Sequence, residues 1–166
     1  MSSGFRCGFS ISWSDIVISS DNGQSWWHPD ERPDDCGAYV IDIAYGNGVI
    51  LVESGHGHVC RSENGGVSWQ RVDVADFLTS QVIFDGAQFM IWSGNVLYTS
   101  PYGDAWTSTD LVPTNVRIGA VARGDDGTLV AVNEGWMTWY DDQRFYRSTD
   151  GVNWSDAVSY HGSHPI

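Results

Sequence analysis

Short apolar runs alternate with turn-forming residues along most of the chain. Runs rich in Val, Ile, Tyr and Phe stand between clusters of Gly, Asn, Asp and Ser, which is typical of short β-strands joined by tight turns. Almost no stretch shows the 3.6-residue spacing of apolar positions that an amphipathic helix requires. The pattern therefore predicts an all-β chain with no helix of consequence.

The apolar runs come in pairs that repeat along the chain. The first runs of three pairs lie at 40–45, 81–84 and 118–123, and the second runs lie at 46–55, 85–94 and 126–135. Each pair leads into a further strand, a turn of the form Ser…Gly…Trp, and a last strand. Four strands in roughly 40 residues is the size of one β-propeller blade.

The Ser…Gly…Trp turn recurs four times, in phase with the strand pairs. Its tryptophans follow one another at intervals of 43, 37 and 48 residues, and the last two turns are one residue shorter than the first two. The defined positions are Ser19, Asp21, Gly23 and Trp26, then Ser62, Asn64, Gly66 and Trp69, then Ser100, Gly103 and Trp106, then Ser148, Asp150, Gly151 and Trp154.

These four turns resemble the Asp-box, or bacterial neuraminidase repeat, with the consensus Ser-x-Asp-x-Gly-x-Thr-Trp. The first copy matches at every defined position with Ser25 for Thr, the second has Asn64 for Asp, and the third lacks the acid. The family includes sialidases, sortilin-type receptors and photosystem assembly factors. The resemblance implies a β-propeller of Asp-box blades, with the boxes on its rim, away from the ligand face.

The residue types of the box suit the closing of a hairpin. Glycine adopts the positive φ that other residues resist. An Asp or Asn side chain accepts hydrogen bonds from backbone N–H groups of the turn, and a serine hydroxyl acts likewise. The tryptophan buries a large apolar area under the hairpin. We therefore expect Asp21, Asn64 and Asp150 to stabilise turns rather than to take part in catalysis.

The repeats predict a single propeller-like domain over residues 1–166, with about four blades at roughly 5–30, 40–74, 81–111 and 117–159. The first blade lacks room for its innermost strand, and no terminal segment obviously supplies one. Because propellers usually have four to eight blades, three forms compete: a piece of a larger protein, a half-propeller that closes as a homodimer, and a small closed ring. Open blade edges promote aggregation, which favours the first two.

The charge balance excludes several classes of partner. The chain carries 21 acidic residues against eight arginines and no lysine, a net charge of −13. Such a surface repels phosphate backbones and anionic lipid, so we expect no nucleic-acid partner and no membrane partner. The chain contains no run of 18 apolar residues that could cross a bilayer, and its first nine residues lack a signal-peptide pattern. The resemblance to secreted propellers nevertheless implies an extracellular or cell-surface location.

The sialidase resemblance offers an enzymatic alternative. Sialidases bind the substrate carboxylate with three arginines and use a Tyr–Glu nucleophile pair. The residues that could imitate this set are Arg117, Arg123, Arg144, Tyr140 and Glu134. The Arg-Ile-Pro motif that precedes the first box in sialidases is absent, and the nearest string, at 116–119, lacks the proline. We therefore predict no catalytic residue, and keep a sialidase-like glycoside hydrolase, or a fragment of one, as the alternative.

One short stretch could hold a metal ion. His56, His58 and Cys60 alternate along the chain and would share a face of a strand. The glycines on both sides of His56 indicate a turn, and no fourth ligand is indicated. We therefore predict no metal site, and no other motif predicts a cofactor.

The chain has three cysteines, Cys7, Cys36 and Cys60. Three thiols allow one disulfide and leave at least one thiol free or paired with another chain. All three pairings stay open at this point, and so does the redox compartment.

The longest departure from the repeat is an insertion in the fourth blade, between Gly135 and Ser148. Propeller loops form binding faces, and aromatic and Arg side chains stack on sugars or anchor protein partners, unless they pack between blades. We predict a non-catalytic binding or scaffold module for a glycan or protein ligand, with an assembly module that completes a propeller by dimerisation as a further alternative. The candidate ligand-binding residues are Trp136, Trp139, Tyr140, Arg144 and Trp92.

Overall fold

Twelve strands and no helix make up the regular structure of the residues that the computed structural model describes, which are 16–29, 36, 40–54, 57–76, 81–133 and 143–160. No membrane-spanning helix is found among them. The strands are β1 (Asp42–Gly46), β2 (Val49–Glu53), β3 (His58–Ser62), β4 (Gln70–Asp73), β5 (Val82–Phe84), β6 (Phe89–Ser93), β7 (Val96–Ser100), β8 (Thr107–Asp110), β9 (Ile118–Arg123), β10 (Leu129–Asn133), β11 (Gln143–Ser148) and β12 (Ser155–Tyr160).

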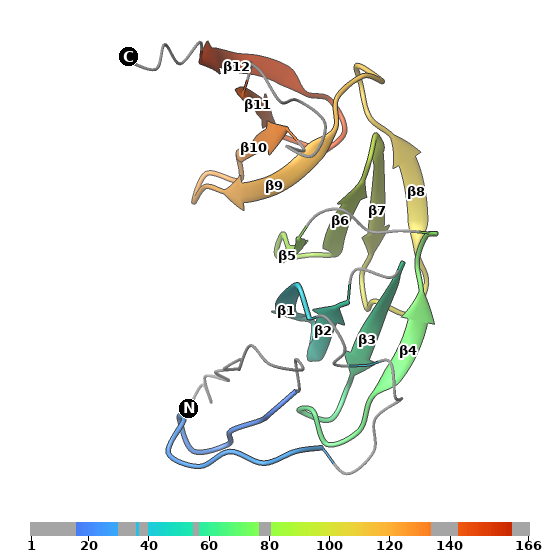
Figure 1. The fold of residues 1–166 in the computed structure, drawn as a ribbon, viewed down its shortest axis with the longest axis vertical. Coiled ribbons are helices and arrows are strands. Elements are labelled where there is room, and N and C mark those ends of the chain that lie inside the picture. The colour runs from blue at the N-terminus through green and yellow to red at the C-terminus, as the bar shows by residue number, and fades with distance from the viewer. Residues whose placement is uncertain are drawn as a thin grey trace, which may run out of the picture.

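The strands form three antiparallel sheets, each a meander of four strands that are consecutive in sequence. The first sheet is β1 to β4, the second is β5 to β8, and the third is β9 to β12. They follow one another along an arc, with β1 and β5 toward its inner side and β4 and β8 toward its outer side (Figure 1). The predicted all-β, propeller-like fold is confirmed.

The first predicted blade is represented among the described residues by a short hairpin at 16–29. Ile18 and Trp27 pair across it through two backbone hydrogen bonds of 2.9 and 3.0 Å. This hairpin lies at one end of the arc and the third sheet lies at the other, and the two ends do not meet (Figure 1). The described residues therefore contain three complete four-stranded blades and part of a fourth.

A tight turn sets the register of the first sheet and connects that sheet to the second by hydrogen bonds. Asn47 and Gly48 join β1 to β2, and both have positive φ, 50° and 80°, as in the type I′ turn that matches the twist of a hairpin. The Asn47 side-chain amide donates hydrogen bonds to the carbonyls of Ala87 and Pro101, at 3.0 and 2.8 Å. One turn residue of the first sheet thus fixes the position of two turns of the second.

The hydrophobic core consists of three clusters, each between neighbouring parts of the arc. Alternate residues of a strand point to opposite faces of its sheet, so the first and second sheets each contribute to two clusters, and the third sheet contributes to one. The hairpin packs Ile16 and Ile18 on Ile50, Val52 and Trp69 of the first sheet. The first sheet packs Val49, Leu51 and Val59 on Val82, Phe89 and Ile91 of the second, and the second packs Met90, Trp92 and Leu97 on Leu129, Ala131 and Tyr146 of the third.

A disulfide joins Cys36 to Cys60 of β3, with the two Cα atoms 5.6 Å apart. Both cysteines are fully buried in the cluster between the hairpin and the first sheet. The pairing that the sequence left open is therefore Cys36 with Cys60. Cys7 lies outside the described residues.

Candidate functional site

One hydrogen bond is common to all four box turns. In each turn the serine hydroxyl oxygen accepts the backbone N–H of the box glycine, which has a positive φ between 71° and 90°. The four pairs are Ser19 and Gly23 (2.7 Å), Ser62 and Gly66 (2.8 Å), Ser100 and Gly103 (2.8 Å), and Ser148 and Gly151 (2.9 Å).

The acidic position of the box binds backbone N–H groups further along the turn. Asp21 Oδ1 accepts the N–H groups of Gln24 and Ser25 at 3.0 and 2.9 Å. Hydrogen bonds from the side chain and backbone of Ser25 lower the pKa of Asp21 to about 2. Asn64 Oδ1 accepts the N–H of Ser68 at 3.0 Å in the second box. A neutral amide therefore makes the same kind of turn contact as a carboxylate.

The box tryptophans differ in burial along the arc. Trp69 and Trp154 are buried, and each donates its Nε1–H to the carbonyl of its own box glycine at 2.8 Å. Trp26 of the first box is 42% exposed, which differs from the burial expected for a box tryptophan. Trp69 packs against the preceding hairpin and Trp154 against the preceding sheet, whereas no described sheet precedes Trp26.

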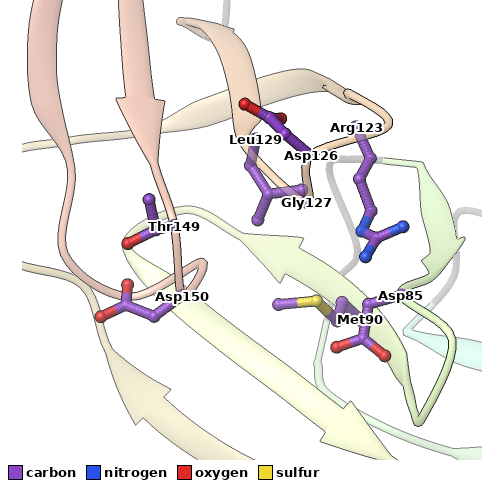
Figure 2. A pocket seen from close by; sticks show the side chains of 8 residues that line it. All are labelled: Asp85, Met90, Arg123, Asp126, Gly127, Leu129, Thr149 and Asp150. Atoms are coloured by element: carbon purple, nitrogen blue, oxygen red, sulfur yellow. The ribbon is translucent and has the colours of Figure 1, made fainter.

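A pocket of about 200 Å³ lies between the second and third sheets, at the end where the box turns are. Three turns bring its polar residues together: Asp85 follows β5, Asp126 follows β9, and Asp150 follows β11. The remaining lining residues are Met90, Arg123, Gly127, Leu129 and Thr149. Figure 2 shows the Arg123 guanidinium directed toward Asp85, while Thr149 and Asp150 lie on the opposite side of the pocket.

Backbone and side-chain hydrogen bonds hold the pocket carboxylates. Asp85 Oδ1 accepts two N–H groups of its turn, each at 2.8 Å. The backbone and side-chain hydrogen bonds of Thr128 lower the pKa of Asp126. Burial raises the pKa of Asp150, but the hydrogen bonds from Asn153, Val152 and Ser148 outweigh it and lower that pKa to about 2. Asp126 and Asp150 are thus ionised at neutral pH.

Three carboxylates and one guanidinium line this pocket, so its formal charge is negative. Ionised carboxylates accept hydrogen bonds and attract cations, but they have no proton to donate. The described part of the chain contains no group of three His, Cys, Asp or Glu residues that could hold a metal ion. The negative charge of the lining favours a cation or a ligand with several hydrogen-bond donors.

Acid is expected to weaken the fold partly through Asp150. Its folded-state pKa of about 2 lies below the ordinary 3.8, so its contribution to stability is present above pH 3.8 and is lost as the pH falls toward 2. Acid lowers the free energy of unfolding, and we expect Asp150→Asn to make this decrease smaller. The change should be no more than about 1 kcal/mol, because solvent screens an exposed carboxylate. Urea unfolding at pH 4 and pH 2 measures it.

Asn64 already occupies the acidic position of the second box, so Asp150→Asn preserves the acceptor of the turn. Asp110→Asn, on the exposed strand β8, is the matched control and should retain the acid sensitivity of the unmodified protein. An Asp150→Asn variant that is as sensitive to acid as the unmodified protein would contradict the prediction.

Neither Trp92 nor Arg144, the described members of the predicted ligand-binding set, lines this pocket. Trp136, Trp139 and Tyr140 lie outside the described residues, as does Glu134. Arg144 is exposed on β11, and its backbone N–H donates to Asn133 Oδ1 at 3.0 Å.

The prediction that Trp92 is a ligand-binding residue is wrong. It is 0% exposed in the core between the second and third sheets. Its ring packs edge-on against Trp154, with ring centroids 6.1 Å apart, and its Nε1–H donates to the carbonyl of Gly151 at 3.1 Å. The side chain therefore offers no surface to a ligand. Residues 89–92 are four apolar residues in a row, and such a run does not show which of them face the neighbouring sheet. The burial of Trp92 could therefore not be predicted from the sequence.

The hypothetical arginine cluster of a sialidase is not formed. Arg117 immediately precedes β9 and Arg123 is its last residue, so the two lie about 20 Å apart for six residues of extended chain. The Arg117 guanidinium lies toward Gly94, in the turn between β6 and β7. Arg144 lies beside Asn133, at the Arg117 end of the sheet. Arg123 instead lines the pocket at the other end.

Two of the three hypothetical metal ligands, His58 and Cys60, bind other groups in the structure. Cys60 is disulfide-bonded, so it is not a thiolate. His58 is 1% exposed, and its Nε2 lies 2.8 Å from the Ser54 hydroxyl, which is also buried. His56 lies outside the described residues.

Sequence reasoning missed Asp85 and Asp126 as pocket residues, and it considered Arg123 only as part of a sialidase-like arginine set. A signal was present, because an Asp-Gly pair occurs at 85–86 and again at 126–127, in phase with the box turns. In a four-stranded meander the first turn and the third turn lie at the same end of the sheet. The phase of the repeat therefore brings these aspartates to the same end as the fourth box.

Comparisons with known proteins support the fold and leave the function open. No family model matches the chain, and no curated protein matches it significantly. A solved structure described as YCF48 bound to D1 peptide is 13% identical, with a TM-score of 0.64 over 92% of this chain and 56% of that chain. An ancestral GH74 enzyme is 18% identical, with a TM-score of 0.64 over 93% of this chain and 24% of that one.

A further similar structure is the GH74 enzyme of Niastella koreensis, 19% identical, with a TM-score of 0.62 over 85% of this chain and 25% of that one. At these identities the likeness shows the fold alone. The chain spans about half the length of the YCF48 chain and about a quarter of the GH74 enzymes.

Proposed function

We propose that this chain is a non-catalytic binding module built from Asp-box blades, and that the pocket between the second and third sheets binds a cationic side chain of a protein partner. The observation that carries the proposal is the set of three carboxylates, Asp85, Asp126 and Asp150, around one pocket of about 200 Å³. The hydrogen bonds that hold Asp126 and Asp150 ionised favour charge recognition over acid catalysis.

The Asp-box assignment rests on the shared geometry of the four turns. Each has the same serine-to-glycine hydrogen bond, and three have an Asp or Asn that accepts turn N–H groups. Four independent copies of one hydrogen-bonding scheme favour a repeat inherited as a unit. The boxes then serve to fix the turns, including the turn that presents Asp150 to the pocket.

A protein ligand fits the charge of the pocket better than a neutral glycan does. Carboxylates form strong, short hydrogen bonds with guanidinium and ammonium groups, whereas sugar binding relies on aromatic stacking. The described lining of this pocket contains no aromatic residue. One neighbour in fold, YCF48, is described as bound to a peptide. A glycan ligand would instead engage the aromatic insertion at 136–146.

The buried disulfide supports an extracellular or cell-surface location. Disulfides form and persist in oxidising compartments and are rare in the cytosol. Cys36 and Cys60 lie within a packed cluster, where such a bond has a structural role. We therefore place the module outside the cytosol.

The test compares three short synthetic peptides that differ only at a central Arg, Ser or Glu, labelled with fluorescein and titrated at about 0.15 M salt. We expect the Arg peptide to bind most tightly and the Glu peptide to bind least. The Asp126→Asn/Asp150→Asn double variant should weaken Arg-peptide binding by about tenfold, because it removes two charge-assisted contacts. Fluorescence anisotropy measures each dissociation constant.

A matched control separates the pocket from the overall charge of −13. Asp104→Asn/Asp110→Asn removes the same charge from exposed positions outside the pocket. It should leave Arg-peptide binding nearly unchanged. Equal weakening by both double variants, or equal binding of the three peptides, would reject the pocket as a cation site.

A glycoside hydrolase is the second candidate, and one observation favours it. Burial raises the pKa of Asp42, and glycosidases need a carboxylic acid that keeps its proton. Asp42 lies directly opposite Glu53 across β1 and β2, but Glu53 is fully buried. Hydrolysis of a panel of fluorogenic aryl glycosides, including a sialoside, that is lost in Asp42→Asn would favour this candidate over the binding module.

A further inference from the structure

Strand pairing makes three positions in the second strands of the sheets equivalent. The box serines Ser62, Ser100 and Ser148 lie opposite Ile50, Phe89 and Leu129. The next residue in each second strand is therefore an equivalent position. These three residues are Leu51, Met90 and Val130.

Two of these positions receive the box glycine of the following sheet. A Cβ placed on Gly103 would lie 2.6 Å from the Leu51 side chain, and one on Gly151 would lie 2.4 Å from Met90. Only a glycine allows the backbone of the box turn to come this close. The third and fourth box turns thus each pack closely against the second strand of the sheet before them.

A buried arginine adds a polar contact to the first of these interfaces. Arg61 lies directly opposite Leu51 and is 4% exposed. Its Nε–H donates to the carbonyl of Tyr102 at 2.6 Å. Tyr102 immediately precedes Gly103, so the contact joins the first sheet to the box turn of the second.

The third sheet has the equivalent surface, the one on which a box turn packs in the first and second sheets, but no described box turn lies on it. Val130 is 44% exposed, whereas Leu51 and Met90 are buried. Arg147 lies directly opposite Val130, as Arg61 lies opposite Leu51, and it is exposed. Val132 and Phe145 form the next cross-strand pair on the same face. We call Val130, Val132, Phe145 and Arg147 the receiving face.

The hairpin at the other end of the arc has the other half of such an interface, which is a box turn with its glycine and tryptophan. Gly23 is the box glycine of the first turn, and a Cβ there would meet only its own Trp26, at 3.6 Å. Trp26 is 42% exposed, and the buried Trp69 and Trp154 are its counterparts. We call Gly23 and Trp26 the inserting edge. Within the described part of the chain, the inserting edge lies at one end of the arc and the receiving face at the other, and no described sheet lies against either.

We propose that a second copy of this chain docks head to tail, so that the inserting edge of each copy packs on the receiving face of the other. Gly23 would lie against Val130 of the second copy, as Gly103 lies against Leu51. Arg147 would donate to the carbonyl of Asn22 of the second copy, because Asn22 precedes Gly23 as Tyr102 precedes Gly103. The proposal uses none of the residues that line the proposed cation pocket.

Two features favour a second copy over another occupant. The interface needs a box turn as its inserting half, and this same chain carries one at its exposed end. The chain also spans 56% of a neighbour of the same fold, so two copies have about the length of one such protein. Head-to-tail contacts form a closed ring when the rotation closes and an open filament when it does not.

Light scattering coupled to size-exclusion chromatography tests the pairing. We expect the unmodified protein to have a mass of about 37 kDa, against 18.3 kDa for one chain. Val130→Asp should give the single-chain mass, because it places a charge in both interfaces. Arg147→Ala should raise the dissociation constant about tenfold. Val67→Asp, at a valine of similar exposure in a box turn, is the control and should stay paired.

Mixing two variants tests the head-to-tail direction. Trp26→Asp and Val130→Asp should each be single chains when alone, and an equal mixture should partly re-form the pair, because one of its two interfaces is then unmodified. A circular dichroism spectrum and melting curve of each variant confirm that it is folded.

Three outcomes would overturn the proposal. The unmodified protein could have the single-chain mass at all concentrations, as expected if the exposed ends bind other blades of a longer chain. It could form species larger than a pair, as expected of an open filament. Val130→Asp and Val67→Asp could also behave alike, which would place any pairing surface elsewhere.

Discussion

Replacing Trp92 with alanine is expected to lower the free energy of unfolding by about 3 to 5 kcal/mol, the range for removing a buried aromatic side chain. Trp92 is 0% exposed and contacts both the second and the third sheet. The variant removes the edge-on contact with Trp154 and the hydrogen bond to the Gly151 carbonyl. It therefore loosens the packing of the third sheet as well as the second.

Urea unfolding followed by tryptophan fluorescence and far-ultraviolet circular dichroism measures this effect. Tyr102→Ala is the control, because the Tyr102 side chain is 53% exposed and its removal should change stability by no more than about 0.5 kcal/mol. Trp92→Phe keeps an aromatic ring and removes the N–H donor, so its effect should fall between the two. Equal effects of Trp92→Ala and Tyr102→Ala would contradict the packing described for the second interface.

Removing the disulfide is expected to have the second largest effect on stability. Cys36 and Cys60 are 24 residues apart, and a crosslink that closes a loop of this length stabilises a fold by about 3 kcal/mol. For a chain of this size the loss corresponds to a fall of about 6 to 12 °C in the melting temperature. Thermal unfolding of Cys36→Ala/Cys60→Ala beside the unmodified protein measures it.

Reduction supplies an internal control for the same prediction. A phosphine reductant should lower the melting temperature of the unmodified protein toward that of the double variant, and it should leave the double variant unchanged. A Cys7→Ala background keeps the third thiol from exchanging with the bond. If the reductant lowers both melting temperatures equally, the stabilisation does not come from the disulfide between Cys36 and Cys60.

The strands and turns of this fold follow from short-range patterns in the sequence. A blade is a meander of consecutive strands, so its turns, apolar runs and box residues all lie within about 40 residues of one another. Local residue types therefore determine most of the hydrogen bonding within a sheet. The positive φ of Gly103 and the serine acceptor beside it are examples that the sequence predicts.

Contacts between sheets could not be predicted in the same way. Trp92 and Val130 both lie on second strands of the repeat, yet one is fully buried and the other is 44% exposed. The difference depends on whether another sheet follows in space, which no local pattern records. The pocket also lies between two sheets, with Asp85 and Asp150 on different ones, and only the phase of the Asp-Gly pairs relative to the box turns indicated it.

The order of the strands has a consequence for how the protein unfolds. Every sheet is a meander of neighbouring strands, and every core cluster joins only adjacent members of the arc. Such a molecule behaves as a one-dimensional chain of units, in which the stability of each unit depends on its nearest neighbours. Within one chain, the first and second sheets have a neighbour on both sides, while the hairpin and the third sheet have one each. Amide hydrogens should therefore exchange first at the two ends of the arc and last in the first and second sheets.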